Sequence, residues 1–263
     1  KDSMCLSTDS HMDFTKDWDR DLLKDWVDAD NEFAVLTAYP LNTADVKIAG
    51  TKSWISLCGY FLTGGVPRGA TGGTMFSDGE KKPRLTMNWA AGQSFARCHA
   101  ERAVPVDKYL RWIFNGEEVD RAVRLWTHGY DLYNPRVNVV LHNYSNAVQK
   151  FWSYSGRDMA QKRAGSEERL RALLQGQATE ETFGKYGLGN QRSLEQYVAW
   201  ARTDLGGKWR DFLRREGITP NFDGFVPTGA SQPRSADLCG QLQRVPVRDV
   251  QALVRRAAAA AAQ

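Results

Sequence analysis

The chain has 263 residues, of which 42% are hydrophobic and 25% charged, a balance that excludes a disordered or collagen-like polymer. Its 35 Lys and Arg against 31 Asp and Glu give a formal net charge of +4, and the basic residues are not clustered, which argues against a nucleic-acid partner. No apolar run is long enough to span a membrane, so the sequence predicts a globular protein with a substantial core and no membrane segment.

The first part of the chain predicts short strands around one helix. Residues 4–8 form an apolar run that ends in a polar cluster from Asp9 to Asp13, as a buried strand does where it enters a loop. Asp19 is typical of a helix cap. The helix after it carries apolar residues on one face: Leu22, Leu23, Trp26 and Val27. The β-rich runs 33–39 and 54–62 follow, and together these elements predict an α/β layer.

Residues 64–79 contain six glycines and predict a mobile surface loop. Glycine density does not distinguish a substrate lid from a tolerated insertion, and both readings stay open. Residues 84–90 alternate as a strand does, and the aromatic stretch 109–114 is expected to be buried.

The rest of the chain is predicted to be mainly helical. Residues 117–126 have helical spacing between Gly116 and a stop near Gly129, and a strand is expected over 136–142. From about residue 166 onward, amphipathic helices alternate with glycine-rich joints, and the alanine-rich end predicts a peripheral helix.

The four cysteines are scattered and form no Cys-x-x-Cys pair: Cys5, Cys58, Cys98 and Cys239. This spacing argues against a zinc ribbon and against a dense disulfide scaffold. We therefore expect four reduced and mostly buried thiols.

Histidines near acidic residues suggest a divalent cation. On an extended segment, Asp9 and His11 would point to the same side and offer one oxygen and one nitrogen, which suits Mn²⁺ and less exclusively Mg²⁺ or Zn²⁺. A capping or turn role is the alternative. His142 lies at the end of a second apolar strand and could be a metal ligand or a hydrogen-bonding residue. His128 is a candidate to hydrogen-bond to the metal ligands and orient them.

Acidic residues at a predicted helix start offer a second kind of chemistry. Glu117 and Glu118 follow Gly116, where the helix dipole stabilises negative charge. One of them could face a cleft and accept a hydrogen bond from a sugar or acceptor hydroxyl, while Arg121 or Arg124 offers positive charge to a phosphate.

Several motifs occur in a fixed order over about residues 2–200: DSHMDF with WD at 9–19, LTAYP at 36–40, FNGEE at 114–118, RLWTHGYDLYNP at 124–135, LHNY at 141–144 and YGLGNQRSLEQY at 186–197. Together they resemble the polypeptide N-acetylglucosaminyltransferases of the hydroxyproline-modifying type. The resemblance implies a metal-dependent, retaining transferase that moves N-acetylglucosamine (GlcNAc) from UDP-GlcNAc to a polypeptide hydroxyl, on hydroxyproline or on Thr or Ser. It also implies an α/β fold of the GT-A type, a single mixed sheet flanked by helices, with a helical C-terminal region.

The resemblance assigns roles to residues of this sequence. Asp9, His11 and His142 would hold Mn²⁺ or Mg²⁺ beside the diphosphate of the UDP-sugar donor. The expected catalytic residues are Glu117, Glu118 and Trp126, the last at the edge of the acceptor or phosphate site. From their chemical type rather than from the resemblance, Arg124 and His128 are expected to bind the nucleotide-sugar cofactor.

The resemblance also divides the chain and leaves alternatives. Residues 1–205 are the expected catalytic region, without the family's N-terminal uridine-binding part, and residues 206–263 form a helical extension with an alanine-rich tail. The loss of the uridine-binding part favours a catalytically silent carbohydrate- or protein-binding module as the alternative, and a metal-dependent hydrolase is a third reading. A cytoplasmic location is expected, or the Golgi if an N-terminal anchor was lost.

Overall fold

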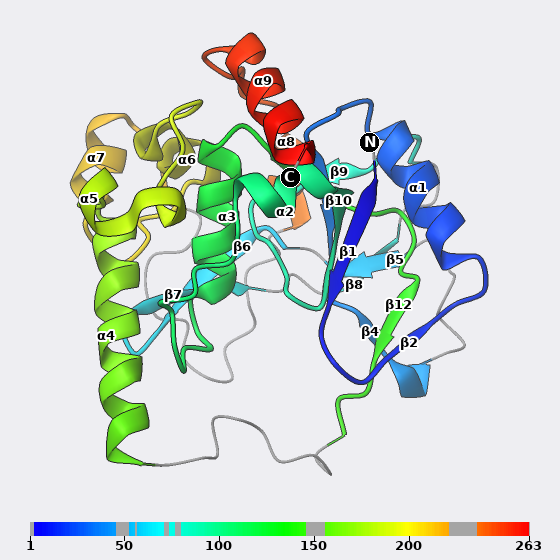
Figure 1. The fold of residues 1–263 in the computed structure, drawn as a ribbon, viewed down its shortest axis with the longest axis horizontal. Coiled ribbons are helices and arrows are strands. Elements are labelled where there is room, and N and C mark those ends of the chain that lie inside the picture. The colour runs from blue at the N-terminus through cyan, green and yellow to red at the C-terminus, as the bar shows by residue number, and fades with distance from the viewer. Residues whose placement is uncertain are drawn as a thin grey trace.

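The computed structural model describes residues 3–45, 53–55, 57–70, 74–76, 80–145, 156–220 and 236–262. Its centre is a five-stranded sheet with four strand pairings of mixed direction (Figure 1). The strands, in spatial order, are β1 (Met4–Thr8), β10 (Gln93–Arg97), β3 (Ala34–Thr37), β11 (Asp131–Asn134) and β9 (Arg84–Leu85). Only β3 and β11 run parallel, and the other pairs are antiparallel, so the sheet is mixed.

Smaller sheets surround this centre. A three-stranded sheet consists of β2 (Met12–Phe14), β12 (Val140–His142) and β4 (Leu41–Asn42). The pair β5 (Ser53–Ile55) and β8 (Thr74–Phe76) and the pair β6 (Gly59–Thr63) and β7 (Val66–Ala70) are both antiparallel. A short 3-10 helix, η1 (Thr43–Asp45), follows β4.

The helices of the described residues are α1 (Trp18–Asp28), α2 (Cys98–Ala103), α3 (Glu117–Thr127), α4 (Arg157–Leu174), α5 (Glu180–Phe183), α6 (Leu194–Ala201), α7 (Arg210–Arg215), α8 (Ala236–Gln241) and α9 (Val250–Ala261), with the 3-10 helix η3 (Gly184–Tyr186) after α5. Helix α1 packs on one face of the main sheet and α3 on the other, and α4 to α7 share an apolar cluster with α3. Figure 1 shows α1 on one side of the central strands and the group from α3 to α7 on the other.

Successive side chains of a strand point to opposite faces of the sheet. In β3 both sets are buried, because a helix packs on each face. Leu36 of β3 packs with Leu22 and Trp26 of α1, while its neighbour Val35 packs with Leu125 of α3. A further apolar cluster, which includes Trp126, joins α3 to the later helices. The expected α/β fold with mixed sheets flanked by helices is confirmed.

Several predicted elements agree with the structure. The strand over residues 4–8 and the helix over 117–126 are present as β1 and α3, and the run 33–39 contains β3. The first helix is present as α1, although Asp17 rather than Asp19 precedes it. Of the four apolar residues expected on its buried face, Leu22 and Trp26 are buried, whereas Leu23 and Val27 are exposed.

Other predicted elements are wrong or shorter than expected. Residues 54–62 do not form one strand: β5 and β6 belong to different two-stranded sheets. The stretch 64–79 contains β7 and β8. Gly64 and Gly65, with positive φ values of 58° and 78°, close the hairpin of β6 and β7. Residues 71–73 and 77–79 of that stretch lie outside the described part. Strand β9 covers only the start of 84–90.

The expectation of buried aromatic residues over 109–114 is also wrong. Tyr109, Trp112 and Phe114 are 48%, 37% and 38% exposed. The expectation of reduced cysteines is wrong as well, because Cys5 is bonded to Cys98 and Cys58 to Cys239. The first bond joins β1 to the start of α2, and the second joins the segment before β6 to α8.

Helix α9 packs on the earlier part of the protein. Leu253 of α9 is 1% exposed and would meet any side chain placed at Gly129. Arg102 of α2 donates a hydrogen bond to the carbonyl of Ala260 (3.1 Å), so the alanine-rich helix is fixed against α2. None of the helices in the described part of the chain is both long and apolar enough to cross a membrane.

Candidate active site

Two of the residues expected to bind metal meet through strand pairing. Asp9 follows β1, and the chain then bends into β2. Strand β2 pairs with β12 so that Met12 lies opposite His142. This pairing places Nε2 of His142 at 4.0 Å from Oδ2 of Asp9, with the histidine side chain 13% exposed and the aspartate side chain 51% exposed.

His11 does not complete a three-residue group. Its φ of 64° is left-handed, so the extended backbone assumed for residues 9–11 is wrong and the alternation of side chains is lost. The exposed ring is hydrogen-bonded through Nδ1 to Oγ of Ser10 (3.0 Å), and the His11 carbonyl accepts from the amide of Asn143 (3.1 Å). Within the described residues, no three His, Cys, Asp or Glu side chains are arranged to hold a metal ion.

The start of α3 brings two carboxylates to the same place. Gly116 turns the chain into the helix with a φ of 97°, and a Cβ there would lie 2.3 Å from Leu170 Cδ2 and 2.6 Å from Val66 Cγ1. Only glycine satisfies both the conformation and the space. Glu117 and Glu118 follow in the first turn of the helix, as the sequence predicts.

Glu118 is held in a fixed orientation. Its Oε2 accepts a hydrogen bond from the Tyr39 hydroxyl, and its Oε1 accepts one from the backbone amide of Ala91 (3.0 Å). Burial raises the pKa of Glu118, the bonds from Tyr39 and Ala91 oppose that rise, and the nearby charge of Arg68 also lowers the pKa. Glu118 therefore connects the end of β3 to the loop before β10.

The carboxylates influence one another. Burial, followed by the negative charges of Glu118, Asp9 and Asp120, raises the pKa of Glu117 to about 7. Asp9 also raises the pKa of Glu118. Asp9, Glu117 and Glu118 thus form one acidic cluster, in which a positive charge would be favourable.

Tyr144 belongs to the same cluster, although it was not singled out from the sequence. Its ring lies 4.2 Å from that of His142, and its hydroxyl donates to the carbonyl of Pro40 (3.0 Å). Burial and the charges of Asp9 and Glu118 raise its pKa to about 12. Tyr39 and Tyr144 are the tyrosines of the LTAYP and LHNY motifs. Their place in these motifs is the sequence signal that points to them.

The other three expected site residues lie elsewhere. Arg124 is buried, pairs with Asp120 (3.1 Å) and donates to the carbonyl of Pro105 (2.7 Å). Trp126 is buried against Trp200, with ring centroids 5.3 Å apart. These positions follow Glu118 by two turns of α3, or about 9–12 Å along the helix axis.

His128, at the end of α3, is equally enclosed. Its Nδ1 lies 2.8 Å from the carbonyl of Arg124, and burial together with the charge of Arg256 lowers its pKa to about 3. The structure therefore does not bring Arg124, Trp126 or His128 to the acidic cluster.

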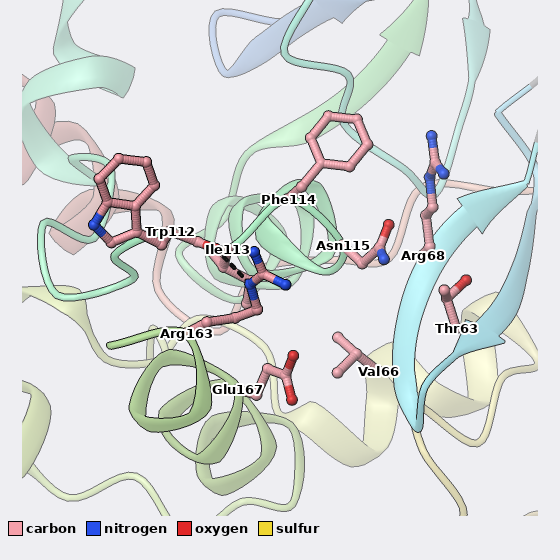
Figure 2. A pocket seen from close by; sticks show the side chains of 9 residues that line it. All are labelled: Thr63, Val66, Arg68, Trp112, Ile113, Phe114, Asn115, Arg163 and Glu167. Carbon is pink, nitrogen blue, oxygen red and sulfur yellow. Dashed lines mark hydrogen bonds between the residues drawn. The ribbon is translucent and has the colours of Figure 1, made fainter. Parts of the chain in front are cut away.

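A cavity of about 440 Å³ lies beside the first turn of α3. Figure 2 shows its lining, which comes from the β6–β7 hairpin, from residues 112–115 and from α4. Arg68 of β7 belongs both to this lining and to the surroundings of Glu118, because its charge lowers the pKa of that residue. The cavity and the acidic cluster are thus neighbours.

The mixed α/β fold and the acidic cluster suit a glycosyltransferase. The comparison with known families supports this: the family model described as "Glycosyltransferase (GlcNAc)" matches residues 1–206. The chain belongs to this GlcNAc glycosyltransferase family. The match runs from β1 through α6 and includes every residue of the acidic cluster. No curated protein matches the chain closely enough to count as a relative.

Proposed function

We propose that the protein transfers GlcNAc from UDP-GlcNAc to a polypeptide hydroxyl, on hydroxyproline or on Thr or Ser, with the help of a divalent cation. Membership of the family supports GlcNAc transfer. The proposed roles of a cation and of an acceptor hydroxyl rest on one observation: Asp9 and His142 meet beside Glu117 and Glu118.

The residues present suit a cation in part. The separation of 4.0 Å between Asp9 and His142 is within the span of one ion with bonds of about 2.1 Å. One carboxylate oxygen and one imidazole nitrogen suit Mn²⁺, and ions of this kind commonly take their remaining ligands from water and substrate phosphates. Asp9 and His142 would hold the ion, which would neutralise the charge that develops on the departing diphosphate. His11 would need to turn from its bond with Ser10 to take part.

Glu117 and Glu118 have different tasks in this proposal. Glu118 is fixed by Tyr39 and Ala91 and forms a rigid wall of the site. Glu117 has a pKa near neutrality and belongs to the same cluster, so it is the better candidate to accept a hydrogen bond from the acceptor hydroxyl and to exchange its proton.

The test is UDP release from UDP-GlcNAc with Mn²⁺ in the presence of peptides that contain hydroxyproline or threonine. His142→Ala should lower the rate about 100-fold or more, since outright loss of a ligand weakens both ion and diphosphate binding. Asp13→Asn, on the neighbouring strand β2, is the matched control and should keep the wild-type rate. Equal rates for wild type and His142→Ala would reject the metal-dependent reaction. The same comparison with His11→Ala decides whether His11 joins the ion.

Calorimetric titration with UDP distinguishes an active transferase from a catalytically silent binding module. A silent module would bind no nucleotide in a Mn²⁺-dependent way, whereas the transferase would. The same titration therefore distinguishes lost catalysis from an intact donor site.

The disulfide bonds bear on the compartment. Cytosolic proteins rarely keep stable disulfides, whereas proteins of the secretory pathway commonly do. With Cys5–Cys98 and Cys58–Cys239 both formed, we infer an oxidising compartment such as the Golgi lumen rather than the cytoplasm.

A further inference from the structure

The cavity beside α3 contains more positive charge than its own carboxylate can balance. Arg68 and Arg163 both line it, together with Glu167. In the described part of the chain, neither arginine lies within ion-pair distance of a carboxylate, while Glu167 is already paired with Arg171 (3.2 Å). Figure 2 shows the guanidinium of Arg163 directed into the space between α4 and residues 112–115.

Neither arginine forms a salt bridge within the described residues, although the charge of Arg68 also acts on Glu118 and lowers its pKa. The guanidinium carbon of Arg68 lies 5.1 Å from the ring centroid of Phe114 and 5.8 Å from that of Phe61. Arg163 donates from Nε to the carbonyl of Trp112 (3.3 Å), which leaves its terminal nitrogens for another acceptor. These contacts orient both side chains and leave guanidinium N–H groups that can donate to a further carboxylate.

The loop that lines the cavity is built into one conformation. Trp112 has a left-handed φ of 57°, which is unusual for a bulky residue and is found at sites where the surroundings enforce it. Helix α4 provides that enforcement: Oγ of Ser166 donates to the carbonyl of Arg111 (2.7 Å), and Arg169 pairs with Asp107 (2.7 Å). The cavity is therefore a formed site on a fixed loop.

The cavity also has the surface that a peptide side chain needs. Val66, Ile113 and Phe114 provide apolar walls, and Asn115 provides a polar one immediately before Gly116. Because the two glutamates of the acidic cluster follow in the next residues, a group bound here would lie close to the reacting hydroxyl.

We propose that this cavity binds an acidic side chain of the acceptor polypeptide, next to the hydroxyl that receives the sugar, through Arg68 and Arg163. The proposal rests on the proposed function only in taking the bound polypeptide as the acceptor. Arginine forms charge-assisted and often bidentate hydrogen bonds with carboxylates. Since the neighbouring Asp9, Glu117 and Glu118 repel anions, only a carboxylate on the Arg68–Arg163 side would be accepted, and this fixes the direction in which the peptide lies.

Binding of two synthetic peptides tests the proposal without donor or metal. Both peptides carry one threonine and one hydroxyproline, and they differ only in having Glu or Gln at the flanking positions. Anisotropy of a neutral dye on the peptide reports the Kd. We expect wild-type protein to bind the Glu peptide about tenfold more tightly than the Gln peptide, as charge-assisted hydrogen bonds predict.

Variants assign the preference to the cavity. Arg163→Gln and Arg68→Gln should each reduce the preference to about threefold or less, while Arg163→Lys retains part of it because the charge remains. Arg157→Gln, at an exposed position of α4 that does not line the cavity, is the matched control and should keep the full preference.

Three results would overturn the proposal: equal binding of the two peptides, no measurable binding of either, or a preference that survives both Gln variants. A loss of UDP affinity in Arg163→Gln with the peptide preference unchanged would assign the arginines to the donor phosphates instead. Absence of sugar transfer alongside a cavity-dependent Glu preference would reject the proposed function and leave the acidic-peptide site standing.

Discussion

The carboxylate of Asp9 lies 4.0 Å from the imidazole of His142, two residues from distant parts of the chain. Antiparallel pairing of β2 with β12 joins them, since residue 142 lies opposite residue 12. The contact therefore depends on the register of a small sheet outside the main one. A shift of one residue in that pairing would turn His142 to the opposite face and separate the two groups.

Gly92 keeps space for this arrangement. A Cβ at that position would lie 2.5 Å from Cδ of Pro40 and 3.7 Å from Oδ2 of Asp9. We expect Gly92→Ala to displace Pro40 and to lower the free energy of unfolding by about 1–3 kcal/mol, measured by urea denaturation. The rate of UDP release should also fall. The Pro40 carbonyl accepts the hydrogen bond from Tyr144, whose ring lies against His142, so a displaced Pro40 would disturb the proposed cation site.

The matched control is Gly165→Ala in α4, where a Cβ would meet nothing within 4 Å. This change should raise the free energy of unfolding by about 0.5–1 kcal/mol, since alanine favours a helix. If Gly92→Ala were as stable and as active as Gly165→Ala, the tight contact with Pro40 would have no role.

Glu117 makes stability depend on pH. Its pKa is raised from 4.5 to about 7 in the folded state, so the folded protein binds this proton more tightly than the unfolded chain does. Stability is therefore lost as the pH rises between these two values. In metal-free protein, Glu117→Gln should be more stable than wild type at pH 8, by up to about 3 kcal/mol, and equally stable at pH 4.5.

Urea denaturation with a chelator at both pH values measures this difference. The same change should abolish the rise in transfer rate through neutral pH, because the neutral amide does not titrate. Parallel stability curves for the two proteins from pH 4.5 to 8 would contradict the raised pKa.

The disulfide bonds make a prediction about thiol content. Protein purified without reductant and then unfolded in iodoacetamide should gain no alkyl groups by intact mass, and should gain them at all four cysteines after reduction. Replacing both Cys5 and Cys98 by Ser should cost about 2–5 kcal/mol of stability, because a cross-link over a long loop is lost. Full alkylation without reductant would show that the thiols are free.

Gly189, in the YGLGNQRSLEQY motif, lies where the backbone of α3 leaves no room for a side chain. A Cβ on Gly189 would lie 2.4 Å from the backbone nitrogen of His128 and from the backbone oxygen of Thr127. Backbone atoms cannot move aside, so Gly189→Ala should cost about 3 kcal/mol or more in urea denaturation. Gly156→Ala is the control, since its extended backbone accepts any residue. Equal stability of the two variants would contradict the close approach.

The parts of the fold that sequence reasoning predicted are those with a strong local pattern. Strand β1 and helix α3 have clear periodicity, and Gly116 marks the start of the helix. No local pattern predicts strands β10 and β11. Residues 131–134 alternate little because both faces of the strand are covered, so no period of two distinguishes them.

The site was predicted in part for a similar reason. Asp9 and His142 were identified as residues at strand ends, and Glu117 and Glu118 by their place at a helix start. His11 was misplaced because spacing shows which residues share a side only if the backbone is extended, and its φ is positive. Chemical type makes Arg124 and His128 candidates, but it does not reveal that each is enclosed and hydrogen-bonded.

Calorimetric titration of UDP into the protein with and without Mn²⁺ tests the central claim most directly, with wild type compared with Asp9→Asn, His142→Ala and the control Asp13→Asn. The account predicts Mn²⁺-dependent binding heat in wild type and Asp13→Asn, and its loss in the other two variants. Mn²⁺-dependent binding of equal strength in all four proteins would contradict the assignment of Asp9 and His142 as the cation site.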